Sequence, residues 1–100
     1  MIVTVLYPNH DGARFDPAYY RDTHAPLAAA IWNPAKIELI EGLPGADGSA
    51  PPFALIAHFH FASAEALGAA MGSPRLAELQ ADVANFTDIV PTITLGKALG

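Results

Sequence analysis

The sequence contains no cysteine, which excludes disulfide bonds, thiolate catalysis and sulfur-ligated metal sites. Basic residues are also scarce: five Lys and Arg, scattered singly, stand against ten Asp and Glu, for a net charge of −5. Nucleic-acid binding needs clustered positive charge, so we expect no nucleic-acid partner. No apolar run has the length of a membrane span, and no charged leader precedes the first apolar residues. We therefore expect a soluble, cytoplasmic protein without a membrane partner.

The sequence also lacks motifs that mark several common enzyme classes. It has no Gly-x-Gly-x-x-Gly loop, no phosphate-binding Lys-Ser/Thr loop and no serine elbow, so nucleotide-dependent chemistry and serine hydrolysis are not indicated. One hundred residues make one compact domain, spanning 1–100, with no room for a separate cofactor domain. The expectation is a single domain that works without a cofactor or a metal.

Apolar and alternating patterns predict four strands, at residues 2–7, 36–41, 53–61 and 89–97. One helix is predicted at 15–32, and two short helices follow Ser63 and Ser73-Pro74. The order strand, helix, strand, strand, helix, strand is typical of the ferredoxin-like split βαβ fold, an α+β fold with both helical regions on one face of a four-stranded antiparallel sheet. Pro91 places the last strand at a sheet edge, because proline cannot donate a ladder hydrogen bond.

The second face of this sheet needs a cover of its own. The first strand is apolar on both sides, with Val3 and Val5 on one side and Ile2 and Leu6 on the other, and the third strand is similar. Both faces are therefore expected to be buried. This predicts a homodimer joined sheet to sheet, and the alternative is a monomer with one apolar face exposed.

The start of the helix at 15–32 is well specified by its sequence. Asp16 can cap the first amides, and Pro17 suits the first helical position because its missing amide would have no partner there. Phe15, just before the cap, can pack against Tyr20 one turn into the helix.

The middle of the same helix combines a histidine with a proline. At about 3.6 residues per turn, Tyr20 and His24 share the apolar side, so His24 is expected to be buried and to need a partner. Pro26 lacks the amide that would bond to the carbonyl of Asp22. A kink beside His24 is the expected result.

A partly buried imidazole can keep a pKa near neutral pH, so His24 is a candidate general base or acid. Asp82, predicted near the end of the third helix, could orient His24 and stabilise its charged form if the two side chains meet. The alternative is that His24 only bonds a carbonyl freed at Pro26.

Other candidates for substrate contacts are aromatic or polar residues near the predicted helices. Tyr20 could bind a substrate oxygen, or it could be a core tyrosine with a satisfied hydroxyl. Trp32 ends the first helix, and Asn85 and Phe86 lie with Asp88 in the turn before the last strand, where a pocket mouth could form. Each of these residues can equally serve packing or capping.

Two further histidines, His58 and His60, alternate with Phe59 on the third predicted strand and so share one face of the sheet. Two imidazoles do not make a metal site, and no nearby carboxylate shares their spacing. We expect these histidines to line a cavity or an interface.

The residues resemble the EthD-like family of the dimeric α/β-barrel superfamily, named for a protein linked to ethyl tert-butyl ether degradation. The resemblance covers nearly the whole chain, and it rests on Tyr7-Pro8, Phe15-Asp16, Tyr19-Tyr20, His24, Pro26-Leu27, Phe61-Ala62-Ser63, Glu65-Ala66, Asp82 and Asn85-Phe86-Thr87-Asp88. It implies the same fold and a dimer. EthD-like proteins are labelled as oxidoreductases without an established reaction. Relatives with this fold include cofactor-independent monooxygenases, polyketide cyclases, lactone isomerases and haem-dependent enzymes.

The resemblance and the residue chemistry together predict a homodimeric, cofactor-independent monooxygenase acting on a small aromatic or polyketide-like compound. His24 would remove a proton, with Asp82 orienting it. A cyclase or isomerase on the same fold would differ in consuming no oxygen. Haem ligation by His24 is implied by analogy alone, and a noncatalytic dimer that binds an apolar metabolite is the alternative from another class.

Overall fold

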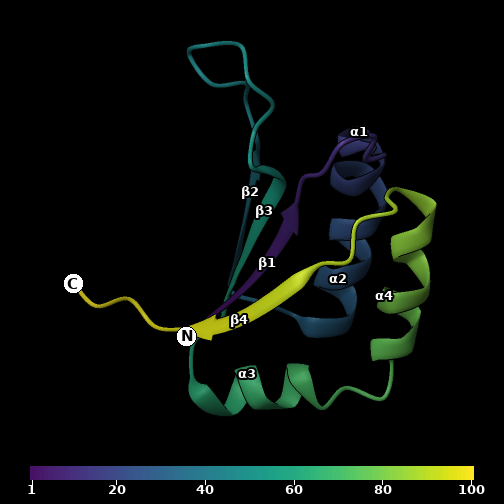
Figure 1. Cartoon of the computed structure of the whole chain (residues 1–100). Helices are drawn as coiled ribbons and strands as arrows, with labels where there is room; N and C mark the ends of the chain where they lie inside the picture. Colours follow the sequence, from purple (N-terminus) through teal and green to yellow (C-terminus); the bar gives the residue numbers. More distant parts are fainter.

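The computed structural model describes residues 1–100 as one sheet with a layer of helices against it (Figure 1). The elements are β1 (Ile2–Pro8), α1 (Pro17–Tyr19), η1 (Tyr20–His24), α2 (Ala25–Trp32), β2 (Lys36–Glu41), β3 (Phe53–His60), α3 (Ala64–Met71), α4 (Leu76–Asp82), η2 (Val83–Asn85) and β4 (Thr92–Gly96). The sheet is antiparallel, in the order β2-β3-β1-β4. The predicted α+β ferredoxin-like fold is confirmed. Each helix is too short or too polar to span a bilayer.

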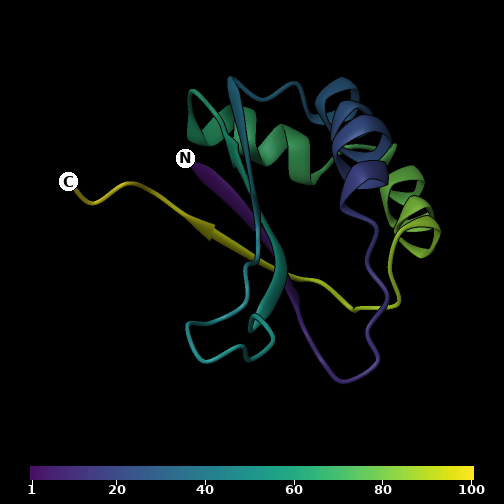
Figure 2. The ribbon, with the colours of Figure 1, turned by 90° about the horizontal axis from the view of Figure 1, so that it is seen from above.

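The helices cover one face of the sheet and leave the other face open (Figure 2). Val3, Val5 and Tyr7 of β1 point into the helix layer and are buried, while their neighbours Ile2 and Leu6 point to the open face and are half-buried. On β3, Leu55, Ala57 and Phe59 likewise join the core. The period of two in the sequence therefore separates a core face from an open face.

The edge position predicted for the last strand is confirmed, but the predicted start is wrong. β4 pairs with β1 alone and begins at Thr92, after Pro91. Ile89 belongs instead to the preceding turn, where its amide donates to the Thr87 hydroxyl at 3.0 Å. Ile93 lies opposite Val5 on the helix side yet remains 53% exposed, so the helix layer leaves this edge uncovered.

The beginning of the first helix matches the prediction. The Tyr19 amide donates to Asp16 Oδ1 at 3.0 Å, and Pro17 occupies the first turn. The rings of Phe15 and Tyr20 are stacked, with centroids 6.1 Å apart. Cap, proline and aromatic contact together fix where the helix starts.

The predicted kink takes the form of a widened helical turn. Over η1 the hydrogen bonds span five residues, and the Ala25 amide donates to the Tyr20 carbonyl. In a regular helix the ring of Pro26 would meet the carbonyl of Asp22, and Pro26 has no amide to bond there. The wider turn accommodates the proline, and His24 is its last residue.

The second helical region has a break that the sequence only partly predicts. The Ala66 amide donates to the Ser63 hydroxyl at 3.1 Å, which confirms the predicted cap of α3. Ser73-Pro74 does not open the next helix directly, because these residues form a turn and α4 begins at Leu76. Asp82 ends α4 as expected and leads into the single turn η2.

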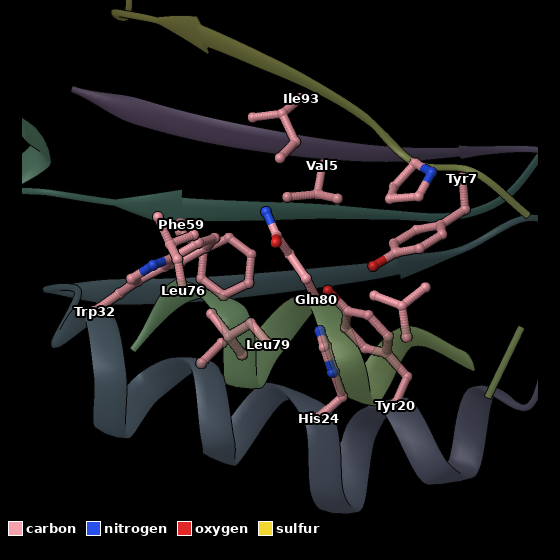
Figure 3. Close-up of a pocket in the computed structure, with 13 residues that line it drawn as sticks. Val5, Tyr7, Tyr20, His24, Trp32, Phe59, Leu76, Leu79, Gln80 and Ile93 are labelled. Carbon is pink, nitrogen blue, oxygen red and sulfur yellow. The ribbon is translucent and has the colours of Figure 1, made fainter. Parts of the chain in front are cut away.

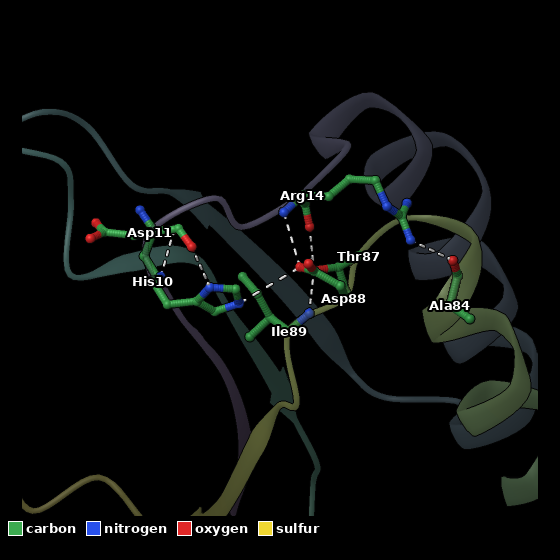
Figure 4. Close-up of polar contacts among 8 residues, drawn as sticks. His10, Asp11, Arg14, Ala84, Thr87, Asp88 and Ile89 are labelled. Atoms are coloured by element: carbon green, nitrogen blue, oxygen red, sulfur yellow. Dashed lines mark hydrogen bonds and ion pairs between the residues drawn. The ribbon is translucent and has the colours of Figure 1, made fainter.

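A set of polar contacts fastens the turn after η2 to the loop before α1 (Figure 4). The Thr87 hydroxyl donates to the Arg14 carbonyl at 2.6 Å, and the Arg14 amide donates to Asp88 Oδ1 at 2.9 Å. The Arg14 guanidinium also donates to the Ala84 carbonyl at 2.9 Å. Asp88 thus belongs to a set of hydrogen bonds, made by Arg14, Thr87 and Asp88, that holds the end of α4 beside the first helix.

Candidate active site

A pocket with a volume of about 80 Å³ lies between the helices and the sheet, beside β4 (Figure 3). Its walls are mainly apolar and consist of Val5, Ala28, Trp32, Phe59, Leu76, Leu79, Val83, Pro91 and Ile93. Tyr7, Tyr20, His24 and Gln80 add polar groups to the lining. An apolar cavity with a few convergent polar groups is the usual form of a small-molecule site.

The polar groups of the pocket lie at two depths. His24 is 6% exposed, and Tyr7 and Tyr20 are each 1% exposed, so these three form the deep part. Gln80 of α4 and Ile93 of β4 are exposed. The pocket therefore opens to solvent between α4 and β4, the edge that the helices leave uncovered.

The structure brings His24 and Asp82 together, although 58 residues separate them in the sequence. Nδ1 of His24 lies 2.8 Å from Oδ2 of Asp82. An ionised carboxylate can only accept, so Nδ1 carries the hydrogen and Nε2 is left with a free lone pair. Figure 3 shows the imidazole directed from its helix toward the cavity. This arrangement is that of a base held by an orienting carboxylate.

Asp82 is itself held by two further donors. The Tyr19 hydroxyl donates to Asp82 Oδ1 at 2.7 Å, and the Asn85 side-chain amide donates to the same oxygen at 2.9 Å. Burial alone would raise the pKa of Asp82, but the hydrogen bonds from Tyr19, Asn85 and His24 hold it below its ordinary value. Asp82 is therefore a carboxylate at neutral pH.

Burial lowers the pKa of His24 below its ordinary value of 6.5, and the hydrogen bond and charge of Asp82 only partly oppose this shift. The imidazole is therefore neutral at pH 7. A neutral imidazole whose Nδ1 is bonded to a carboxylate has its Nε2 available to accept a proton.

The widened turn explains why Tyr19 can reach Asp82. At about 3.6 residues per turn, Tyr19 and His24 would point roughly 140° apart, whereas a turn with i to i+5 hydrogen bonds brings residues five apart onto one side. Both side chains consequently bond to Asp82. No role was assigned to Tyr19 from the sequence. The available signal was Pro26, because this proline causes the wide turn that brings Tyr19 to the side of His24.

Tyr7 and Tyr20 form a pair of hydroxyl groups in the pocket, and their oxygens point toward one another in Figure 3. Burial raises the pKa of Tyr7 to about 12, although its hydrogen bond with Tyr20 works in the opposite direction. Burial also raises the pKa of Tyr20, and the neighbouring Tyr7 adds to the rise. Both hydroxyls therefore stay protonated. Tyr20 donates to Tyr7, so the Tyr7 hydrogen is the one free for a ligand oxygen. Tyr7 was missed as a site residue; its position on the buried side of the first strand was the available signal.

The remaining candidates near the pocket have different positions. Trp32 lines the cavity, and its ring meets that of Phe59 edge to face at 4.9 Å. Phe86 is fully buried behind His24, with ring centroids 4.7 Å apart, and Asn85 is exposed and bonds to Asp82. Phe86 and Asn85 thus support the imidazole and the carboxylate and do not line the cavity.

His58 and His60 point to the open face of the sheet, opposite to the pocket of His24. Nδ1 of His58 lies 2.8 Å from the Thr4 hydroxyl, and Nε2 of His60 lies 2.5 Å from Oε1 of Glu38. Glu38 approaches from β2 through cross-strand pairing, which residue spacing within one strand does not reveal. No group of three or more His, Asp or Glu side chains is placed to hold a metal ion.

Asp82→Asn is expected to lower the pKa of His24 further, because the negative charge that raises it is removed while an acceptor for Nδ1 remains. The measurement is a pH titration of the imidazole by NMR. The matched control is Asp88→Asn, which removes a carboxylate that bonds to Arg14 and not to His24. An unchanged His24 pKa in Asp82→Asn would contradict the electrostatic interaction between the Asp82 carboxylate and the His24 imidazole.

Comparisons with known proteins agree with this architecture. The family model described as the EthD domain matches residues 8–89, a segment that contains both His24 and Asp82. The crystal structure of an EthD-like protein from Ralstonia eutropha is 39% identical, with a TM-score of 0.88 over 99% of this chain and 91% of that chain. The comparison with curated proteins gave no match.

Two more distant structures share the fold alone. An ethyl tert-butyl ether degradation (EthD) family protein from Bacillus halodurans is 18% identical, with a TM-score of 0.62 over 94% of this chain and 97% of that chain. A protein from Arabidopsis thaliana is 13% identical, with a TM-score of 0.61 over 99% of this chain and 97% of that chain. The match of the family model over most of the chain, together with the 39% identical structure, decides the classification: this chain belongs to the EthD family.

Proposed function

We propose that the protein is a cofactor-independent enzyme that removes a proton from a small aromatic or polyketide-like compound and acts as a monooxygenase. The observation that carries this proposal is the neutral His24 imidazole at an apolar pocket, with Nδ1 bonded to Asp82 at 2.8 Å and Nε2 free. A single positioned base is sufficient for proton abstraction from an activated carbon or a phenol.

The first step follows from the residues around the base. An acidic C–H or O–H of the substrate faces Nε2 of His24, which takes the proton, and the Asp82 carboxylate stabilises the imidazolium that forms. The charge left on the substrate oxygen is stabilised by the Tyr7 hydroxyl, which remains protonated and accepts from Tyr20. An apolar wall strengthens these interactions because it keeps water away from them.

The second step distinguishes the two candidate reactions. In the monooxygenase reaction, molecular oxygen reacts with the carbanion of an activated methylene group, one oxygen atom forms a ketone and the other leaves as water. In a cyclase or isomerase, the same carbanion attacks a carbonyl of its own molecule or is protonated at another carbon. The Asp82, His24 and tyrosine arrangement serves the first step of either reaction, and oxygen uptake separates them.

The assay that tests this proposal measures oxygen uptake and quinone formation with anthrone, a ketone with an activated methylene group. The rate should rise with pH and reach half of its maximum below pH 6.5, because only the neutral imidazole accepts a proton and burial lowers the pKa of His24. A half-maximal rate above pH 6.5 would contradict His24 as the base. Product without oxygen uptake would favour the cyclase or isomerase, and tight binding without turnover would favour an accessory binding protein.

We also propose that a second copy of the chain covers the open face of the sheet. Ile2, Leu6 and Ile56 are half-buried on this face although no helix lies over them, which leaves apolar area for a partner to bury. Light scattering of the purified protein should give twice the chain mass of 10.5 kDa. A mass equal to one chain at micromolar concentration would contradict the dimer.

A further inference from the structure

Gln80 is the polar side chain at the mouth of the pocket. It comes from α4, is exposed and belongs to the pocket lining. Figure 3 shows it extending from α4 across the cavity toward the side where Val5 and Ile93 lie. The side chain therefore lies on the path between solvent and the deep part of the pocket.

The carboxamide of Gln80 differs from the other polar groups of its helix in being unpaired. Glu78 forms a bidentate ion pair with Arg75, at 2.7 and 3.1 Å, and Asp82 accepts from three donors. The Gln80 side chain makes no hydrogen bond within the chain, although it crosses a cavity with largely apolar walls. A carboxamide offers two donor hydrogens and one acceptor oxygen, so it can bond to a ligand carbonyl or hydroxyl.

The pocket thus has polar groups in its deep part and at its mouth, and apolar side chains around both. His24, Tyr7 and Tyr20 form the deep end, and Gln80 is at the mouth. Val5, Leu79 and Val83 lie among the apolar side chains of the lining. A complementary molecule has an acidic oxygen for the deep groups, an apolar ring against the apolar lining and a second oxygen near the mouth.

We propose that Gln80 is a specificity-determining residue that selects hydroxyaromatic compounds with a second, carbonyl-type oxygen by donating a hydrogen bond to it. This inference rests on the proposed function, because it assumes that the acidic group of the ligand lies against His24. The carbonyl is held at the mouth, which orients the ring in the apolar section.

The test compares two phenols of nearly equal shape, 4-hydroxyacetophenone and 4-ethylphenol, of which only the first has the second oxygen. Their dissociation constants are measured by calorimetry for the unmodified protein and for Gln80→Met, which keeps an unbranched side chain of similar length without the amide. We expect Gln80→Met to weaken the binding of 4-hydroxyacetophenone by about five- to tenfold and that of 4-ethylphenol by less than about twofold. Comparing each probe with itself cancels the difference in acidity between the two phenols.

The matched control is Glu78→Met, a change on the same helix outside the pocket lining, which should leave the ratio of the two constants unchanged. If Gln80→Met weakens both probes equally, or changes neither, Gln80 does not recognise the second oxygen and the inference is overturned. If neither phenol binds the unmodified protein, the proposed function fails together with the inference. Suppose that 4-ethylphenol binds and that His24→Ala weakens its binding. If Gln80→Met then leaves the ratio of the two dissociation constants unchanged, only the inference fails.

Discussion

Replacement of His24 by alanine is expected to lower the turnover rate by about 10²- to 10⁴-fold, the contribution of a positioned general base. The loss should appear in kcat, measured as oxygen uptake with anthrone, because Nε2 is the group that takes the proton in the proposed reaction. Binding of an apolar ligand without an acidic hydroxyl should largely persist, since most of the pocket lining comes from other residues.

The control for this variant is His10→Ala, which changes an exposed histidine in the loop after β1. Its rate should equal that of the unmodified protein, because His10 lies outside the pocket. If His24→Ala retains the full rate, His24 is not the base. If the unmodified protein binds ligand but shows no turnover with any activated methylene compound, the noncatalytic alternative gains support.

Phe86→Ala is expected to have the largest effect on stability, a loss of about 3–5 kcal/mol in the free energy of unfolding. Phe86 is 0% exposed, and its ring lies 4.7 to 6.1 Å from the rings of five neighbours. These neighbours are Tyr7, Phe15, Tyr19, Tyr20 and His24. Alanine would leave a cavity behind the imidazole. A single domain is stable by only about 5–15 kcal/mol, so the loss is a large share of the total.

Urea denaturation followed by circular dichroism measures this effect. Val90→Ala is the matched control, because Val90 is 83% exposed and its truncation should change the free energy by less than about 0.5 kcal/mol. Phe86→Leu should fall between the two, because leucine fills part of the space. If Phe86→Ala is no less stable than Val90→Ala, the aromatic cluster does not support the fold as described.

Local patterns predicted the order of elements and much of their placement. The alternation of Val3, Val5 and Tyr7 with Ile2 and Leu6 reports directly which side of a strand is buried, because successive side chains point to opposite faces. Caps are equally local: the bond from the Tyr19 amide to Asp16 involves residues three apart. Such features follow from a few neighbouring residues, and a single sequence contains them in full.

The candidate site depends on contacts that no local pattern reports. His24 and Asp82 meet because hydrogen bonds from Arg14 to the turn after η2 hold the end of α4 beside the first helix. Arg14 and its partners Thr87 and Asp88 are more than 70 residues apart in the sequence. The sequence named the histidine and the carboxylate, but their distance came only from the fold. The predicted start of β4 was wrong for a related reason. Ile89 is an apolar, β-branched residue of the kind that favours strands, but its amide donates to the Thr87 hydroxyl and so belongs to the turn.

The five-residue turn at Tyr20–His24 also affects how members of the family are aligned. It contains one residue more than a regular helical turn, so a homologue with a regular helix here would need a gap of one position between Tyr19 and His24. An ungapped alignment would pair His24 with a neighbour of the equivalent histidine. A homologue could then be recorded as having lost its histidine when the residue has only moved by one column.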